Sequence, residues 1–136
     1  MKELIYDLKN NNLKVTPQRL AIYGYLKNTK THPSADSIYK ELKADYPNMS
    51  LATVYKNVAS LKNAGLVTEL NVGEESFRYD GNTKPHAHVV CKCCHKVTDY
   101  YGKVTSDSII SNAENDTGYS IDSQQVYFFG LCNDCL

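Results

Sequence analysis

The sequence predicts an α+β fold in two parts: helices and a β-hairpin come first, and a shorter piece of strands with one helix follows. Apolar residues recur at helical spacing in four segments before residue 66, whereas short β-prone runs dominate the rest of the chain. A chain of 136 residues has room for one or two small domains, but not for a large enzyme scaffold. We therefore expect a first domain over residues 1–80, a hinge over 81–85 and a second domain over 86–136.

Start and stop signals delimit the four expected helices. Thr16 before Pro17 reads as an N-cap followed by proline at the first helical position. Ser34 and Ser50 precede two further periodic segments, and Gly65 stands where a helix commonly ends. The first helix ends at residues 10–12, and the others cover 17–28, 34–44 and 51–65. Their expected buried positions are Leu4, Ile5, Leu8, Ala21, Ile22, Tyr25, Leu26, Ile38, Tyr39, Leu42, Val54, Val58 and Leu61.

The fourth helix carries a polar outer face. That face consists of Thr53, Tyr55, Lys56, Asn57 and Ser60. Two β-prone runs, 66–70 and 76–79, follow around a turn at 71–74. Helices followed by a two-stranded wing are typical of a winged helix-turn-helix, whose last helix enters the DNA major groove. An ordinary surface helix is the alternative, and the order of caps and wing favours DNA binding.

Charge is balanced overall but unevenly distributed. The chain has 15 Lys and Arg against 15 Asp and Glu. Residues 1–80 carry eleven basic and nine acidic residues (+2), and residues 81–136 carry four and six (−2). A dimer that concentrates the basic half on one face could bind DNA, with less non-specific attraction than a strongly basic protein.

The compartment follows from two expectations. No apolar run approaches the roughly 18–20 residues that a membrane span needs, and the first residues do not open a signal peptide. Five cysteines without an export signal indicate a reducing compartment, where thiols serve metal or redox chemistry. We expect a cytoplasmic protein that does not contact membranes.

The second part should be a small α/β domain. Short strands are expected around 88–91 and 97–100, a helix over 104–115 and a final strand over 120–129. A piece this short is hard to stabilise alone. We therefore expect it to be a dimerisation domain that pairs with a second copy of the chain.

Two Cys-x-x-Cys pairs predict a structural zinc site. Cys91 with Cys94 and Cys132 with Cys135 would give four thiolates and a closed tetrahedral shell. The alternatives are a redox-active dithiol or unrelated buried cysteines, although a thioredoxin-type pair would begin a helix after a strand. The fifth cysteine, Cys93, is expected to be a spectator.

A second metal site of different chemistry is indicated nearby. His86 and His88 would point to the same side of an extended segment, because side chains alternate along a strand. Asp80, Asp99 and, in the first half, His32 are further candidate ligands. Imidazoles with carboxylates suit Fe(II), Mn(II) or Zn(II). Each residue alone also has an ordinary explanation, such as a surface histidine or a turn aspartate.

The chain resembles the ferric uptake regulator (Fur) family over nearly its whole length, and within it most resembles the peroxide-stress regulators (PerR). The residues that carry the resemblance are Thr16-Pro17-Gln18-Arg19, His32-Pro33-Ser34-Ala35-Asp36, Ala52-Thr53-Val54-Tyr55, Phe77-Arg78-Tyr79-Asp80, His86-Ala87-His88 and both cysteine pairs. The resemblance implies a homodimer that represses transcription from a pseudo-palindromic double-stranded operator when metal is bound.

The resemblance also assigns roles to residues. Four cysteines (Cys91, Cys94, Cys132, Cys135) would hold structural Zn(II), and five residues (His32, Asp80, His86, His88, Asp99) would hold regulatory Fe(II) or Mn(II). Tyr55 and Arg19 would belong to the DNA-binding surface, beside Thr53, Lys56 and Asn57 of the polar helix face. His95 departs from the family, which usually has glycine there.

Peroxide sensing is the function that the resemblance implies. Peroxide sensors of the family typically carry Asp at the position of Asp99, where iron-uptake regulators carry Glu. With Fe(II), hydrogen peroxide would convert His32 or His86 to 2-oxo-histidine and release the DNA. The alternatives are an iron- or manganese-responsive uptake regulator, a small metalloenzyme, and a zinc-stapled DNA-binding module without a sensing role. We expect no enzyme, because no nucleophile or general base stands out beyond the ligands.

Overall fold

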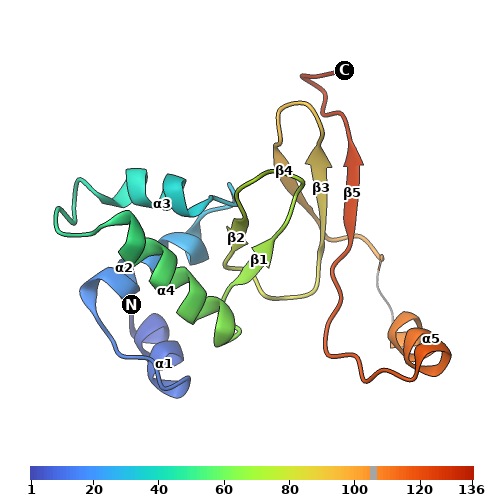
Figure 1. Ribbon diagram of the computed structural model, residues 1–136, viewed down its shortest axis with the longest axis horizontal. Coiled ribbons are helices and arrows are strands. Elements are labelled where there is room, and N and C mark those ends of the chain that lie inside the picture. Colours follow the sequence, from blue (N-terminus) through green and yellow to red (C-terminus); the bar gives the residue numbers. More distant parts are fainter. Residues whose placement is uncertain (105–106) are drawn as a thin grey trace. The chain divides into compact units, whose positions relative to one another are not determined.

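The structure, a computed structural model, describes residues 1–104 and 107–136. The chain forms two compact units, Met1–Thr83 and Lys84–Leu136 (Figure 1). The division falls within the stretch expected to be a hinge. The first unit has four helices and a two-stranded sheet, and the described part of the second has one helix and a three-stranded sheet, which agrees with the predicted α+β class.

The first unit contains four helices and a hairpin. The helices are α1 (Lys2–Asn10), α2 (Pro17–Asn28), α3 (Ala35–Leu42) and α4 (Leu51–Asn63), and the strands are β1 (Thr68–Leu70) and β2 (Arg78–Asp80). The predicted N-caps are confirmed: the side chains of Thr16, Ser34 and Ser50 each accept a hydrogen bond from the backbone N–H three residues on. These bonds fix where α2, α3 and α4 begin.

One apolar core holds this unit together. Leu8, Ile22, Ile38, Val54 and Leu61 are all fully buried in it, so α1 to α4 each contribute. The predicted stripe of α2 is partly wrong. Its buried residues are Ile22, Tyr23 and Leu26, whereas Ala21 and Tyr25 are only half-buried. Tyr23 is tolerated inside because its hydroxyl donates to Asp7 Oδ2 at 2.7 Å.

The hairpin is shorter than predicted. β1 pairs antiparallel with β2, with Thr68 opposite Asp80 and Leu70 opposite Arg78. The residues before β1 terminate α4 instead of pairing: Gly65 has a φ of +77°, and Leu66 N–H donates to Leu61 O at 2.9 Å. This is a C-terminal capping arrangement, so strand pairing begins two residues later than expected. Likewise, α3 ends at Leu42 rather than Ala44.

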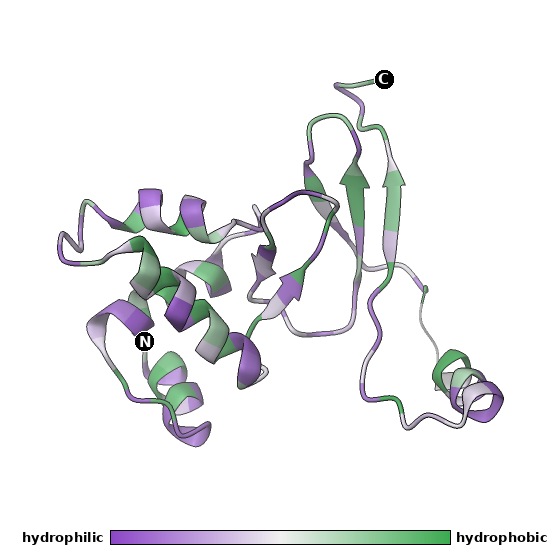
Figure 2. Ribbon diagram, viewed as in Figure 1, coloured by the Kyte–Doolittle hydropathy of each residue, from purple (hydrophilic) through white to green (hydrophobic). Residues whose placement is uncertain are grey.

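The second unit is a three-stranded sheet with one helix. Its strands are β3 (Ala87–Cys91), β4 (Val97–Tyr100) and β5 (Tyr127–Gly130), in the order β4-β3-β5, and its helix is α5 (Asp107–Thr117). β3 pairs antiparallel with β4 and parallel with β5. Hydrophobic residues gather on β3 and β5, as Figure 2 shows.

Two predictions for this unit need correction. The final strand was expected over 120–129 but covers only Tyr127–Gly130, because the residues after α5 form an irregular connection. Gly118 has a φ of +75°, and Glu114 Oε2 accepts from Ile121 N–H at 3.0 Å, which ties this connection back to α5. The helix was expected over 104–115; Val104 is not helical, and residues 105 and 106 lie outside the described residues.

Within the described part of the chain, no helix combines the length and the apolar character that crossing a bilayer requires.

Candidate metal centres and nucleic-acid interface

Four cysteines of the second unit bring their sulfur atoms together. The Sγ atoms of Cys91, Cys94, Cys132 and Cys135 lie within 4.8 Å of one another. Cys94 Sγ and Cys132 Sγ are 3.7 Å apart. Sulfurs bound to one tetrahedral zinc at about 2.3 Å would be separated by about 3.8 Å, so this pair fits a zinc ion.

The sheet explains why two pairs so distant in sequence meet. Parallel pairing sets Cys91, at the end of β3, opposite Gly130, at the end of β5, and Lys92 N–H donates to Gly130 O at 2.8 Å. Each Cys-x-x-Cys segment therefore leaves the sheet at the same end. Both segments continue as turns and not as helices, which argues against the thioredoxin-type alternative.

Backbone N–H groups point at the sulfur of Cys91. The N–H groups of Cys132 and Cys94 approach Cys91 Sγ at 3.4 and 3.5 Å. These hydrogen bonds lower the pKa of the Cys91 thiol to about 5, since they stabilise its thiolate. The thiolate is the form that binds metal.

Cys93 lies closer to the cluster than a spectator position suggests. Its side chain is exposed. Hydrogen bonding with the thiols of Cys132 and then Cys93 raises the pKa of Cys135. Cys93 is therefore a neighbour of the four-cysteine group, while its role stays a prediction.

Two histidines of the second unit converge on one carboxylate. His86 Nε2 is 3.1 Å and His88 Nε2 is 3.4 Å from the same oxygen, Asp99 Oδ1. The register of the sheet causes this, because His88 on β3 stands opposite Asp99 on β4. The predicted alternation is confirmed: both imidazoles lie on one side, with ring centroids 4.5 Å apart. Ligand atoms at about 2.1 Å from a shared ion are about 3.0–3.4 Å apart, so these distances suit a divalent metal.

The tautomer of His86 is set by a backbone carbonyl. His86 Nδ1 lies 2.7 Å from Lys84 O. A carbonyl oxygen only accepts, so Nδ1 carries the hydrogen and Nε2 presents its lone pair when the ring is neutral. This is the usual way in which a second partner orients a metal-binding histidine.

Tyr101 is a neighbour of this group that sequence reasoning missed. Its ring stacks on His86 with centroids 5.2 Å apart, and its hydroxyl donates to Asp99 Oδ2 at 3.4 Å. Its position two residues after Asp99 could have suggested it, because alternate residues of an extended segment share a side.

The first unit holds a buried imidazole–carboxylate pair of its own. His32 Nε2 lies 3.4 Å from Asp80 Oδ2, and the two residues are only 2% and 5% exposed. Two hydrogen bonds join the loop before α3 to β2: Arg78 Nη1 donates to His32 O at 3.2 Å, and Tyr79 N–H donates to Pro33 O at 3.0 Å. The loop and the strand thereby hold one imidazole nitrogen and one carboxylate oxygen side by side.

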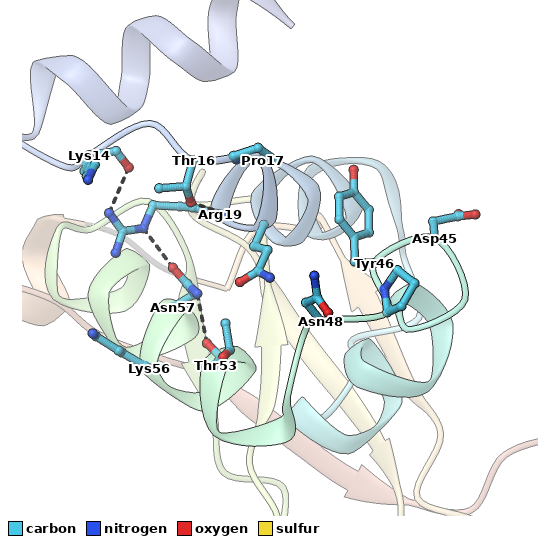
Figure 3. A pocket seen from close by; sticks show the side chains of 12 residues that line it. Lys14, Thr16, Pro17, Arg19, Asp45, Tyr46, Asn48, Thr53, Lys56 and Asn57 are labelled. Atoms are coloured by element: carbon cyan, nitrogen blue, oxygen red, sulfur yellow. Dashed lines mark hydrogen bonds between the residues drawn. The ribbon is translucent and has the colours of Figure 1, made fainter.

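The predicted DNA-binding residues surround the start of α2 and α4. Tyr55 and Lys56 are exposed on α4, and Thr53 is half-buried. An open pocket of about 650 Å³ lies beside them, and it is lined by the cations Lys14, Arg19 and Lys56 (Figure 3). Asn57 needs a correction: it was expected on the exposed face but is buried, with a 2.9 Å hydrogen bond from Arg19 Nε.

Comparison with known proteins identifies the family. The sequence pattern of the ferric uptake regulator family matches residues 10–129. The chain belongs to the Fur family. This confirms the resemblance and the α+β fold drawn from the sequence. Fur-family proteins are regulators.

Several relatives of this Fur-family chain carry names that refer to peroxide. It is 39% identical over 135 residues to the peroxide operon regulator of Bacillus subtilis, covering 99% of this chain and 92% of that protein. It is 38% identical to the peroxide-responsive repressor PerR of Staphylococcus saprophyticus, covering 99% and 90%. Among solved structures, the Campylobacter jejuni peroxide stress regulator is similar, with 37% identity, a TM-score of 0.73 and coverage of 96% and 98%.

Proposed function

We propose that this Fur-family protein is a metal-dependent transcriptional repressor that senses hydrogen peroxide. The observation that carries the proposal is the convergence of His86 and His88 on the carboxylate of Asp99. The family resemblance links an aspartate at this position to peroxide sensing, and the names of the relatives also refer to peroxide. A repressor acts on the chromosome, so the cytoplasm is the proposed compartment.

Structural Zn(II) is the proposed occupant of the four-cysteine group. Four sulfurs within 4.8 Å, one of them already favoured as a thiolate, form a closed soft shell that selects zinc over harder ions. The ion would join the ends of β3 and β5, Cys91 and Gly130, which are 39 positions apart in the chain. We therefore assign it a structural role.

The regulatory ion is proposed to be Fe(II) or Mn(II), held by His32 and Asp80 of the first unit with His86, His88 and Asp99 of the second. Nitrogen and carboxylate ligands suit both ions. Ligands drawn from both units would couple metal binding to the arrangement of the DNA-reading helices. Moving such an equilibrium from 1:99 to 99:1 takes about 5.5 kcal/mol of differential affinity.

The histidines are the proposed point of attack by peroxide. When bound, Fe(II) supplies the reaction in which hydrogen peroxide transfers one oxygen atom to the imidazole of His32 or His86 and leaves as water, whereas Mn(II) supports repression without it. The product, 2-oxo-histidine, has hydrogen on both ring nitrogens. The lone pairs of these nitrogens are delocalised into the new carbonyl, so neither nitrogen is available to a metal. Loss of one ligand weakens the coupling, so repression ends.

DNA binding is proposed for α4 and its surroundings. Tyr55 and Lys56 are exposed there, and Thr53 lies on the same face. The pocket beside them contains three cations and the carboxylate of Asp45, a balance that favours phosphate. Two such surfaces in a dimer would read the two halves of a pseudo-palindromic operator.

A second copy of the chain is the proposed partner of the second unit. Val89 and Phe128 are neighbours by strand register and are 39% and 44% exposed. Tyr100 packs edge-on against Phe128, with ring centroids 6.2 Å apart, and is also exposed. An apolar patch on the sheet of so small a unit suits a homodimer interface.

Metal-dependent DNA binding tests the proposal. Duplexes from a random pool are selected on Mn(II)-loaded protein, and the selected operator is then used in gel shifts with and without Mn(II). We expect binding that requires Mn(II) and is lost in His86→Ala. Binding that persists in His86→Ala with its metal dependence unchanged would contradict regulation through this histidine and favour a DNA-binding module without sensing.

A further inference from the structure

Arg19 connects two elements of the predicted DNA-binding surface. It is the third residue of α2, and its guanidinium reaches in two directions, as Figure 3 shows. Nε donates to Asn57 Oδ1 on α4 at 2.9 Å, and Nη1 donates to Lys14 O in the loop before α2 at 2.9 Å. The residues Arg19 and Asn57 are 38 positions apart, so this contact is a tertiary one.

Both polar atoms of the Asn57 side chain form hydrogen bonds inside the protein. It is 7% exposed, its Oδ1 accepts from Arg19, and its Nδ2 donates to Thr53 O at 2.9 Å. To contact a DNA base, the amide would have to leave both partners and move out of a buried position. Burial and internal hydrogen bonds therefore argue against a direct contact between Asn57 and a DNA base.

The start of α2 is fixed by the same residue. Arg19 N–H donates to the Thr16 hydroxyl at 3.1 Å, which caps the helix, while the side chain of Arg19 holds the Lys14 carbonyl. The backbone from Lys14 to Arg19 is thus tied at both ends. The side chains of Lys14 and Lys56 line the pocket that this loop and α4 share.

We propose that Arg19 and Asn57 form a latch between the loop before α2 and the recognition helix, and that both are positioning residues for DNA binding instead of direct DNA contacts. The inference rests on the proposed function. Through the latch, the exposed Tyr55 and Lys56, which directly precede Asn57 in sequence, are held in register with Lys14. The planar fork of arginine can donate along two directions at once, which a lysine ammonium on a flexible stem cannot reproduce.

Four variants separate a latch from a phosphate contact: Arg19→Lys, Arg19→Met, Asn57→Leu and the double variant Arg19→Met/Asn57→Leu. We expect each single variant to weaken operator binding about tenfold and the double variant to lose no more than either single one, because both break the same contact. Lys56→Ala is the control for a direct cation and should reduce the slope of log affinity against log salt by about one. The slope should stay unchanged in Asn57→Leu and Arg19→Lys.

A direct phosphate contact predicts a different pattern. Arg19→Lys would then keep most of the affinity, Arg19→Met would lower the salt slope as Lys56→Ala does, and Asn57→Leu would be neutral. That pattern would overturn the latch. Multiplying losses in the double variant would overturn it too, since independent residues add in free energy.

A measurement without DNA keeps the test independent of the proposed function. In a ¹H–¹⁵N NMR spectrum of the wild-type protein, the Arg19 Nε–H should exchange slowly with water, and exchange should accelerate in Asn57→Leu but not in Lys56→Ala. Fast exchange in the folded wild type would overturn the latch even if every variant failed to fold. A protected Nε–H in a protein that binds no duplex would instead contradict the proposed function, and the positioning role with it.

Discussion

His95 holds the turn after the first cysteine pair in a backbone conformation that favours glycine. Its φ is +64°, and its N–H donates to Cys91 O at 3.0 Å. Histidine is tolerated in the left-handed region better than most residues, but its Cβ still costs roughly 1 kcal/mol. We predict that His95→Gly raises the stability of the zinc-loaded second unit by about 0.5–1 kcal/mol, measured by thermal unfolding.

His95→Ala is the matched control for this prediction. Alanine removes the imidazole but keeps the strained backbone, so its stability should not exceed that of the wild type. A loss of stability in both variants would show that contacts of the imidazole outweigh the backbone strain.

The length of the acidic side chain at position 99 is predicted to govern how fast peroxide oxidises the histidines of the Fe(II) form. Asp99 Oδ1 is shared by His86 and His88, and one extra methylene would displace that oxygen from both. In Asp99→Glu we expect Mn(II)-dependent DNA binding to survive and histidine oxidation by peroxide in the Fe(II) form to fall about tenfold or more. Peptide mass spectrometry measures the oxidation. Asp116→Asn on the exposed face of α5 is the control, and equal oxidation in Asp99→Glu and wild type would contradict the prediction.

Individual residues show what a sequence can and cannot indicate. Strand alternation correctly placed His86 and His88 on one side, because the rule is local. Asn57 was misplaced, since helical periodicity gives a direction but not the arrangement of α2 that covers it. The burial of Tyr23 was missed for a related reason. Its hydrogen-bond partner Asp7 belongs to α1, and no local sequence pattern indicates that contact.

At the scale of elements, β2 runs close to the end of α2. An added Cβ at Gly81, the residue after β2, would lie 2.3 Å from Leu26 O, a backbone atom that cannot rotate away. We predict that Gly81→Ala destabilises the first unit by about 1–3 kcal/mol, measured by denaturant unfolding. Gly130→Ala is the control, because an added Cβ there meets nothing within 4 Å. Equal stability of the two variants would mean that β2 can shift away from α2 at little cost.

Element boundaries were predictable where they depend on neighbouring residues. The caps at Thr16, Ser34 and Ser50 place three helix starts correctly. The final strand was overextended, because β propensity continues through residues 120–126 while pairing partners exist only opposite Tyr127–Gly130. Strand length is set by the partner strand, and that information is not local.

At the scale of the whole molecule, the two units differ in how they are stabilised. The main apolar cluster lies within residues 8–79, whereas the buried apolar residues described in the second unit are only Ala87, Val90, Cys91 and Val97. A unit with so small a core needs a metal or a partner. We predict that zinc removal by a chelator, or Cys135→Ser, unfolds the second unit and leaves the first folded.

Amide hydrogen exchange read by mass spectrometry measures this unit by unit. Exchange should rise in peptides of 84–136 and stay slow in α2 and α4. Cys93→Ser is the matched control, since it changes a thiol outside the proposed zinc shell and should keep protection. Unchanged protection of residues 84–136 after complete zinc removal would contradict a structural role for the ion.

The groups of residues that could hold a metal were visible in the sequence, because residue type and spacing carry ligand chemistry. Two Cys-x-x-Cys pairs and a His-x-His segment predict metal sites wherever the fold brings them together. What brings them together, the parallel pairing of β3 with β5 and the antiparallel pairing of β3 with β4, came only from the structure.

The most direct test of peroxide sensing compares two metals under one oxidant. Protein that contains the structural zinc is loaded with Fe(II) or Mn(II) in the absence of oxygen. Operator binding is measured by gel shift before and after a pulse of hydrogen peroxide, and peptide mass spectrometry is run on the same samples. We predict that the Fe(II) form alone loses the operator and gains the mass of one oxygen atom on the peptide containing His32 or His86. An Fe(II) form that keeps full affinity and unmodified histidines would contradict the sensor assignment and indicate a metal-uptake regulator.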